Sequence, residues 1–216
     1  MRLTRLIINT IILCSVILGI IATHITNNFM SNNSILYFTM QSNILVALIS
    51  LIFIIYDILK HKIPNILYIL KYIFTVAITL TFLVFNFILV PYMNIPNIYD
   101  LANILLHIIS PICTILSFIL DNNFKNKNNY YILGITFPLI YLIFTYILYF
   151  LPYNIFIDSK FPYFFLDFEK YGWFSIKNNS IGVIYYYIII LVMTLGISKI
   201  LLILNNKGSN YVKKTI

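Results

Sequence analysis

The stretch LYFTMQSNILVALISLIFIIY, residues Leu36–Tyr56, contains no charged side chain and decides the class of fold. A bilayer core about 30 Å thick needs about 20 residues of α-helix to cross it, so this stretch is long and apolar enough to span a membrane. Five further uncharged runs have a similar length: Leu6–Thr23, Tyr72–Val90, Leu101–Leu120, Tyr130–Leu151 and Ser180–Ser198. The sequence therefore predicts an all-α polytopic membrane protein, a bundle of six transmembrane helices.

The composition of the whole chain agrees with this class. Of its 216 residues, 61% are hydrophobic and 9% are charged, whereas a soluble domain carries about a quarter charged residues to cover its surface. No internal repeat or change of composition marks a second domain. We predict one six-helix domain over residues 1–216, with helices over residues 6–23, 36–56, 66–90, 101–120, 130–151 and 180–204.

Two other interpretations of the apolar runs are less favoured. The first run follows Arg2 and Arg5, as the apolar region of a cleaved signal peptide would, but it is longer than usual and no small-x-small cleavage site follows it. Strands of a membrane β-barrel would alternate apolar and polar residues, whereas these runs are continuously apolar. We therefore expect an uncleaved first helix.

The basic residues indicate the side of the membrane on which each connection lies. The net charge is +8, yet the first and third connections, residues 24–35 and 91–100, contain no Lys or Arg. Basic residues instead gather before the first run, in the second and fourth connections and at the C-terminus. This positive-inside pattern predicts a plasma-membrane protein with both termini in the cytoplasm. It interprets Arg2, Arg5 and Lys71 as topology signals, and not as contacts to nucleic acid.

The two cysteines carry little chemistry in this interpretation. Cys14 and Cys113 each lie within an apolar run, where a free cysteine behaves as a small hydrophobic residue. They predict no disulfide framework and do not indicate a metal site. We expect neither a metal nor a cofactor.

Polar side chains follow one face of the fourth run at spacings of three and four residues. They are Asn103, His107, Ser110, Thr114, Ser117 and Asp121. An unpaired polar side chain in lipid is unfavourable, so this face should turn into the bundle. Pro111 cannot donate a backbone hydrogen bond to the carbonyl of His107, and we expect the helix to bend there.

The second run opens with an unusually polar segment around Thr39. Under the predicted topology the second and fourth helices both run inward from the outer surface, and the helical rise places Thr39 about 5 Å and His107 about 9 Å below it. Two interpretations stay open. These side chains either hold helices together, which the residues alone favour, or form a reactive pair.

The fifth connection is the one long loop, and its segment Phe161–Trp173 mixes aromatic with charged residues. Such a mixture is typical of a segment at the membrane surface, where Trp and Tyr rings are enriched. Trp173 is the only tryptophan of the chain. We favour an aromatic anchor over a lid that covers a site.

Three segments occur in order along the chain. They are Phe38-Thr39-x-Gln41-Ser42-Asn43, then His107-x-x-x-Pro111 with Asp121 further on, and Pro162-Tyr163-x-Phe165-Leu166-Asp167 followed by Tyr171-Gly172. In this order and spacing they resemble a bacterial family of six-helix membrane proteins, the Pr-six-Pr type. That family looks distantly similar to the eukaryotic androgen-induced-gene family of membrane proteins.

The resemblance implies an intramembrane hydrolase of lipid esters, such as fatty-acid esters of hydroxy fatty acids, with Thr39 as nucleophile and His107 as base. A neutral histidine can take the proton of a hydroxyl group, which then attacks the ester carbonyl. Donors to the oxyanion would come from Gln41, Ser42 or Asn43. Asp167 either orients His107 or ties down the outer loop, and the second role is slightly favoured. Membrane lipids would be the partners.

Two functions without hydrolysis compete with this one. A non-enzymatic scaffold or accessory protein would use the polar stripe only to pack its helices. A transporter would favour inverted repeats with helix breaks at matching positions. Pro111 and Pro138 break the fourth and fifth runs, but the first two runs have no counterpart, so a transporter is less favoured.

Overall fold

The structure is a computed structural model that describes residues 2–26, 33–92, 99–121, 123–124, 128–151, 160–177 and 180–214. Its α-helices are α1 (Arg2–Thr26), α2 (Phe38–Ile58), α3 (Asn65–Val84), α4 (Val90–Tyr92), α5 (Leu101–Ile104), α6 (Ser110–Ile119), α7 (Thr136–Tyr149), α8 (Phe168–Tyr171) and α9 (Val183–Lys214). The 3₁₀ segments are η1 (Ser34–Leu36), η4 (Asn128–Ile135) and η5 (Phe164–Leu166), and the π-helical turns are η2 (Phe85–Leu89) and η3 (Leu105–Ile109). A short antiparallel pair, β1 (Ile176–Lys177) and β2 (Ser180–Ile181), precedes α9.

Consecutive elements join into six helical segments that are long and apolar enough to cross a membrane. These segments are Arg2–Ile25, Phe38–Ile58, Asn65–Leu89, Leu101–Ile119, Asn129–Tyr149 and Val183–Gly208. The prediction of an all-α protein with six such helices is confirmed. Lys125, Lys127 and Asp158, which the charge pattern included, lie outside the described residues.

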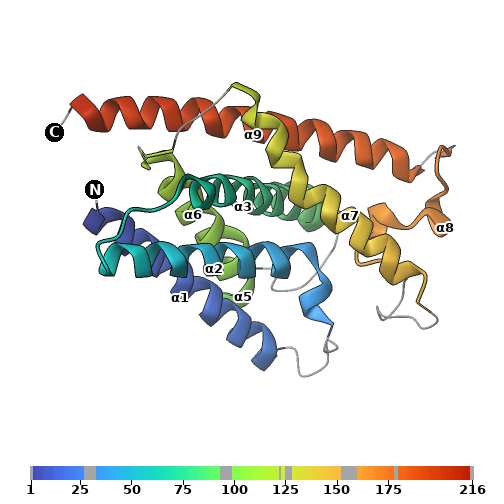
Figure 1. The fold of residues 1–216 in the computed structure, drawn as a ribbon. Coiled ribbons are helices and arrows are strands. Elements are labelled where there is room, and N and C mark those ends of the chain that lie inside the picture. Colours follow the sequence, from blue (N-terminus) through green and yellow to red (C-terminus); the bar gives the residue numbers. More distant parts are fainter. Residues whose placement is uncertain are drawn as a thin grey trace.

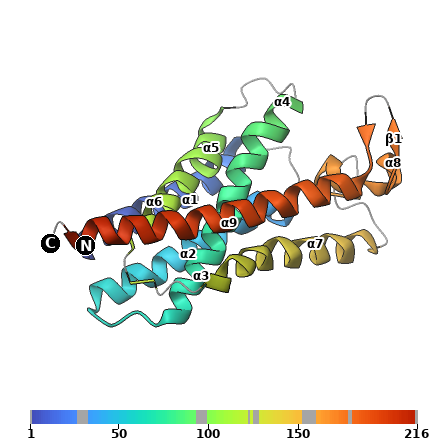
Figure 2. The ribbon, with the colours of Figure 1, turned by 90° about the horizontal axis from the view of Figure 1, so that it is seen from above.

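The six segments form a bundle with two distinct ends (Figures 1 and 2). We call the end where α1 begins and α9 finishes the terminal end, and the end that carries α8 and the β1–β2 pair the loop end. Helix α3 lies in the middle and contacts α2, α6, α7 and α9, while α1 packs against α2 and α6. Both described ends of the chain therefore lie on one side of the bundle.

The core centres on Tyr72 of α3, which is fully buried. Its ring lies 5.5 Å from that of Phe118 and 5.8 Å from that of Phe124, and its hydroxyl is 2.8 Å from the Ser198 hydroxyl of α9. On the other side of Ser198, a Cβ added at Gly134 would collide with the serine hydroxyl. A glycine is therefore required for η4 to approach α9 this closely.

Several buried threonine hydroxyl groups bond to a carbonyl of their own helix. Thr75 donates to the carbonyl of Lys71 at 2.7 Å, and Thr114 donates to that of Ser110 at 2.7 Å. Such bonds to the preceding turn remove the cost of placing a hydroxyl in an apolar environment. Threonine is therefore no obstacle to membrane-spanning helices in this chain.

The two π-turns share a local cause. In η2 the N–H of Val90 donates to the carbonyl of Phe85, and in η3 the N–H of Ser110 donates to that of Leu105. Each turn is followed by a proline, Pro91 after η2 and Pro111 after η3, whose missing N–H interrupts the α-helical pattern. We expected a bend of the helix near Pro111, and the structure has a π-turn, Leu105–Ile109, immediately before it.

Candidate functional site

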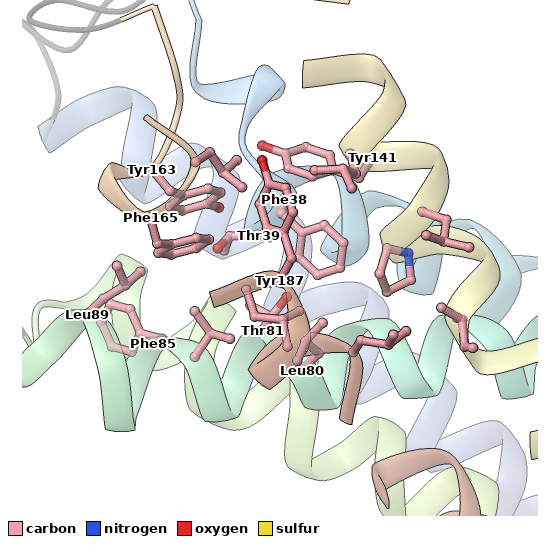
Figure 3. A pocket seen from close by; sticks show the side chains of 18 residues that line it. Phe38, Thr39, Leu80, Thr81, Phe85, Leu89, Tyr141, Tyr163, Phe165 and Tyr187 are labelled. Atoms are coloured by element: carbon pink, nitrogen blue, oxygen red, sulfur yellow. The ribbon is translucent and has the colours of Figure 1, made fainter. Parts of the chain in front are cut away.

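An apolar cavity of about 110 Å³ lies within the bundle toward the loop end (Figure 3). Its walls come from α2, α3, η2, η4, α7, η5 and α9. Among the described lining residues no side chain is charged, and the polar ones are all hydroxyl-bearing: Thr39, Thr81, Tyr141, Tyr163 and Tyr187. The cavity therefore suits an apolar molecule that offers one or two polar groups.

Several of these hydroxyl groups are already committed to protein partners. Tyr141 donates to the carbonyl of Leu36 at 3.0 Å, and the Thr81 and Ser42 hydroxyls lie 2.9 Å apart. Such bonds hold the wall in place, because each group would otherwise be buried without a partner. The Tyr187 hydroxyl lies 2.5 Å from that of Tyr146. Thr39 and Tyr163 are left as the pair of hydroxyl groups to consider.

Thr39 lies in the first turn of α2 and is half-buried at the cavity. Its hydroxyl group is in hydrogen-bonding contact with Tyr163, which lies in the loop segment 160–177 at the loop end. Burial among neighbouring rings raises the pKa of Tyr163 to about 12. At neutral pH the Tyr163 hydroxyl therefore keeps its proton, so it serves as a donor and not as a base.

His107 lies in the π-turn η3 and is buried, with 7% of its surface exposed. Its ring stacks on that of Phe85, with centroids 3.6 Å apart and planes 12° from parallel. Its buried Nδ1 has no hydrogen-bond partner. Phe85 also lines the cavity, whereas His107 is not among the described residues that do. Phe85 thus contacts both the histidine and the cavity.

Asn43 connects the two candidate residues through the backbone. Its Nδ2 donates to the carbonyl of Thr39 at 2.9 Å and to the carbonyl of Leu106, the neighbour of His107, at 3.1 Å. The predicted second and fourth helices are therefore in contact at the level of Thr39 and His107. Sequence spacing alone did not establish this contact.

The remaining predicted site residues are the suggested oxyanion donors and Asp167. Ser42 contacts Thr81 and the carbonyl of Thr39, and both amide hydrogens of Asn43 have carbonyl partners, so neither side chain points a free donor at the cavity. Gln41 is half-buried. Asp167 accepts from the N–H of Lys170 at 3.0 Å and so caps α8 at the loop end.

The polar stripe of the fourth run faces the interior of the bundle, as predicted. Ser110, Thr114, Ser117 and Asp121 are all at most 5% exposed. The Ser117 hydroxyl lies 3.1 Å from Oδ1 of Asn9 in α1. At Ser117 and Asp121 the stripe therefore contributes polar contacts to other helices, whereas Ser110 Oγ has no hydrogen-bond partner.

A second polar site, which the sequence did not predict, occupies the terminal end. We call it the ionic cluster, and its members are Arg2, Arg5, Asp57, Lys71 and Asp121. Arg5 binds both oxygens of Asp57, with Nε–Oδ2 and NH2–Oδ1 distances of 2.8 and 2.5 Å. The side chain of Asp57 is fully buried. This bidentate geometry is that of a strong, specific pair.

Lys71, the lysine of the ionic cluster, belongs to α3 and is buried in the bundle. Its Nζ lies 3.3 Å from Asp121, donates to the carbonyl of Ser117 at 3.1 Å and sits 4.6 Å from the ring centre of Phe53. Interpreting Lys71 and Arg5 only as topology signals was therefore wrong. Both are held by acidic residues of other helices, which a pattern along one chain segment does not reveal.

Together these features define the class of protein: an integral, multi-pass membrane protein whose six helices carry a buried ionic cluster at one end and an apolar cavity toward the other. Within the described part of the chain, no three potential metal ligands among His, Cys, Asp and Glu gather at one place. No protein-family model matches the chain, and no curated protein or solved structure matches it either.

Proposed function

We propose that this protein is an intramembrane hydrolase of lipid esters, with Thr39 as its nucleophile and His107 as its base. The observation that carries the proposal is the hydroxyl group of Thr39 at the wall of an apolar cavity inside a membrane protein. An apolar acyl chain is well suited to such a cavity, because burying apolar surface away from water is favourable. Its ester carbonyl would then lie beside the hydroxyl group.

The nature of the walls favours a lipid over a charged substrate. None of the described lining residues carries a charge that could replace the hydration of an ionised group. Several aromatic rings, among them Phe38, Phe85 and Phe165, offer broad apolar surface instead. We therefore expect an uncharged acyl group in the cavity.

The reaction would proceed in two steps. His107 takes the proton from Thr39, the hydroxyl oxygen bonds to the ester carbon, and the alcohol leaves with the proton that His107 returns. Water then attacks the acyl group on Thr39, with His107 again as base, and releases the fatty acid. The partnerless Nδ1 of His107 supports this role, since it has no other hydrogen bond to break.

Phe85 has to turn aside before this proton transfer. Its ring covers that of His107 and also lines the cavity. The ring belongs to a π-turn, and such turns are frequent at functional sites. We expect substrate in the cavity to displace this ring and bring Thr39 within reach of His107.

Tyr163 is the best placed donor for the oxyanion. Its hydroxyl group contacts Thr39 and keeps its proton at neutral pH because burial raises its pKa. A protonated phenol that faces the developing negative charge would stabilise the transition state. We therefore favour Tyr163 over Asn43 as the oxyanion donor, because both amide hydrogens of Asn43 already bind protein carbonyls.

The site would lie near the outer surface of the plasma membrane. The described basic residues with exposed side chains at the terminal end include Arg2, Lys60, Lys62 and Lys207. A basic end favours the cytoplasmic side, and the same location follows for both termini. The loop end, with Thr39 and Tyr163, would then face outward.

A covalent probe tests the proposal. The purified protein in detergent is treated with a fluorophosphonate, and the adduct is located by mass spectrometry. We expect labelling at Thr39 that is lost in Thr39→Val and in His107→Ala, while Thr81→Val, at the same cavity, stays labelled. A protein that unfolds cooperatively but shows neither labelling nor ester turnover would rule out the hydrolase.

One observation favours a second function, a non-enzymatic membrane protein that only binds lipid. Among the described residues Thr39 contacts Tyr163, and no hydrogen bond joins it to His107. If the pair never meets, the cavity holds a lipid without chemistry. Thr39→Val would then leave both lipid binding and the physiological role intact.

A further inference from the structure

The cavity meets the lipid-facing surface of the bundle between α7 and α9. Leu139 of α7 and Leu191 of α9 both line the cavity, yet 49% and 41% of their surfaces are exposed. Both lie within membrane-spanning segments. Their neighbours Ile143 and Val192 are even more exposed and do not line the cavity. The two leucines thus mark the margin between the cavity and the bilayer.

The opposite side of the cavity, toward the loop end, is covered by the outer loop. Phe165 and Leu166 are each 5% exposed and form part of the wall. The ring of Tyr163 stacks on that of Phe165, with centroids 5.0 Å apart (Figure 3). A molecule that comes from the water phase therefore meets a packed aromatic layer, whereas one from the bilayer meets the margin at Leu139 and Leu191.

Thr39 lies at the same level of the bundle as the margin. The ring of Phe38, the neighbour of Thr39, is 5.2 Å from that of Phe137 and 5.0 Å from that of Tyr141, which flank Leu139 in α7. Counting along α9 and α7 from the loop end puts Leu191 about 12 Å and Leu139 about 15 Å deep, at the level of acyl chains. A molecule that enters from the bilayer at the margin therefore reaches Thr39 without changing its depth.

From this arrangement we infer that the ligand is a long-chain acyl ester of the bilayer, and that its chain enters the cavity sideways between α7 and α9. The inference rests on the proposed lipid-ester hydrolase for the fate of the ligand. Its binding step is independent of that chemistry. The Tyr146–Tyr187 hydroxyl contact at 2.5 Å ties the two helices together and would bound this opening.

The experiment uses a photoreactive probe in the full-length protein. A fatty-acid methyl ester with a diazirine in the middle of its chain is incorporated with the protein into lipid nanodiscs, irradiated, and its adducts are mapped by mass spectrometry. All variants also carry Thr39→Val, so that hydrolysis cannot remove the probe. We expect adducts on cavity residues such as Leu142 and Ile190.

Matched tryptophan variants locate the path. L139W with L191W should lower labelling of the cavity about tenfold, because the two indoles overpack the path of the chain. I143W with V192W adds the same bulk to exposed positions of the same helices and should leave labelling unchanged. Thermal unfolding shows that both variants fold.

The outcomes separate the two ideas. Sideways access would be overturned if the two pairs of variants changed cavity labelling equally or if neither pair changed it. The absence of cavity adducts would overturn it as well. Labelling that L139W with L191W alone suppresses, together with no ester turnover by the protein that retains Thr39, would support the path and reject the hydrolase.

Discussion

The two ends of the bundle treat buried polar groups in opposite ways. In the ionic cluster at the terminal end, Arg5, Asp57, Lys71 and Asp121 come from four helices and all find partners of opposite charge. At the cavity the wall is apolar, Thr39 touches one phenol and the nearby His107 keeps an unpartnered nitrogen.

The difference indicates a division of tasks between the two ends. Charges buried in a low-dielectric interior are costly unless paired, so a cluster that pairs them all holds its helices in one arrangement. A polar group without a partner, such as Nδ1 of His107, does not stabilise the fold and is available to a ligand. Mutations at the terminal end should therefore affect folding, and mutations at the cavity should affect function.

The largest effect on stability is expected for Asp57→Ala. It leaves Arg5 without its bidentate partner in a buried setting, which should cost about 3–5 kcal/mol of unfolding free energy. Equilibrium unfolding in mixed detergent measures this loss. The exposed Lys62, replaced by Ala, is the control and should unfold like the native protein. An Asp57→Ala protein of native stability would refute the role of the cluster.

A double-mutant cycle tests the second pair of the cluster. Lys71→Met and Asp121→Leu should each cost about 3 kcal/mol, because each leaves a buried charge without its partner. Together they replace the pair by apolar side chains, and the double mutant should recover about 2 kcal/mol relative to the sum. Additive losses in the same unfolding assay would show that the two side chains do not interact.

At the cavity end, Thr39→Val should change stability by only about 1 kcal/mol, the cost of one lost hydrogen bond to Tyr163. Ester turnover by the same variant should be abolished. Measuring the melting temperature and the turnover on one preparation sharpens the contrast with Asp57→Ala. If Thr39→Val unfolded the protein, the cavity end would also be a structural centre, and the division of tasks would fail.

The smallest effect is expected in the loop segment 160–177 at the loop end. Hydrogen bonding from Tyr149, with a contribution from Lys160, lowers the pKa of Glu169 below its ordinary value of 4.5. Its contribution to loop stability is therefore present above that value and is lost as the pH falls through the lowered pKa. Trp173, stacked 4.9 Å from Phe168, reports on the loop by fluorescence.

In this titration we expect the fluorescence of the native protein to change below pH 4.5, and that of Glu169→Gln to change less. The variant keeps an acceptor for Tyr149 but has no carboxyl group to titrate. Equal titration curves for the two proteins would show that another group controls the loop.

The sequence predicted the six helices because uncharged runs of membrane length leave a chain few alternatives. The same search for uncharged runs could not predict the ionic cluster, because each charged residue was taken to mark the end of a run. Lys71 precedes the third run and was interpreted as a topology signal, and Asp57, which follows the second run, was given no role. Their partners come from other helices, and a single sequence contains no record of such pairing.

The candidate site was predicted in part. The polar start of the second helix and the face of His107 were visible in the sequence, and their helices do meet through Asn43. Phe85 was not predicted, because one phenylalanine among many gives no signal. The loop around Tyr163 was expected at the membrane surface, and its contact with Thr39 depends on a tertiary fold that periodicity does not encode.

The π-turns at Phe85–Leu89 and Leu105–Ile109 have a consequence for chain length. A π-turn amounts to one residue inserted into an α-helix, so removing one residue there restores regular hydrogen bonding while both flanks keep their faces. Removing a residue elsewhere would rotate the rest of the helix by about 100°. These two turns are therefore the positions where this bundle can best accept a one-residue deletion, and such a deletion would also part Phe85 from His107.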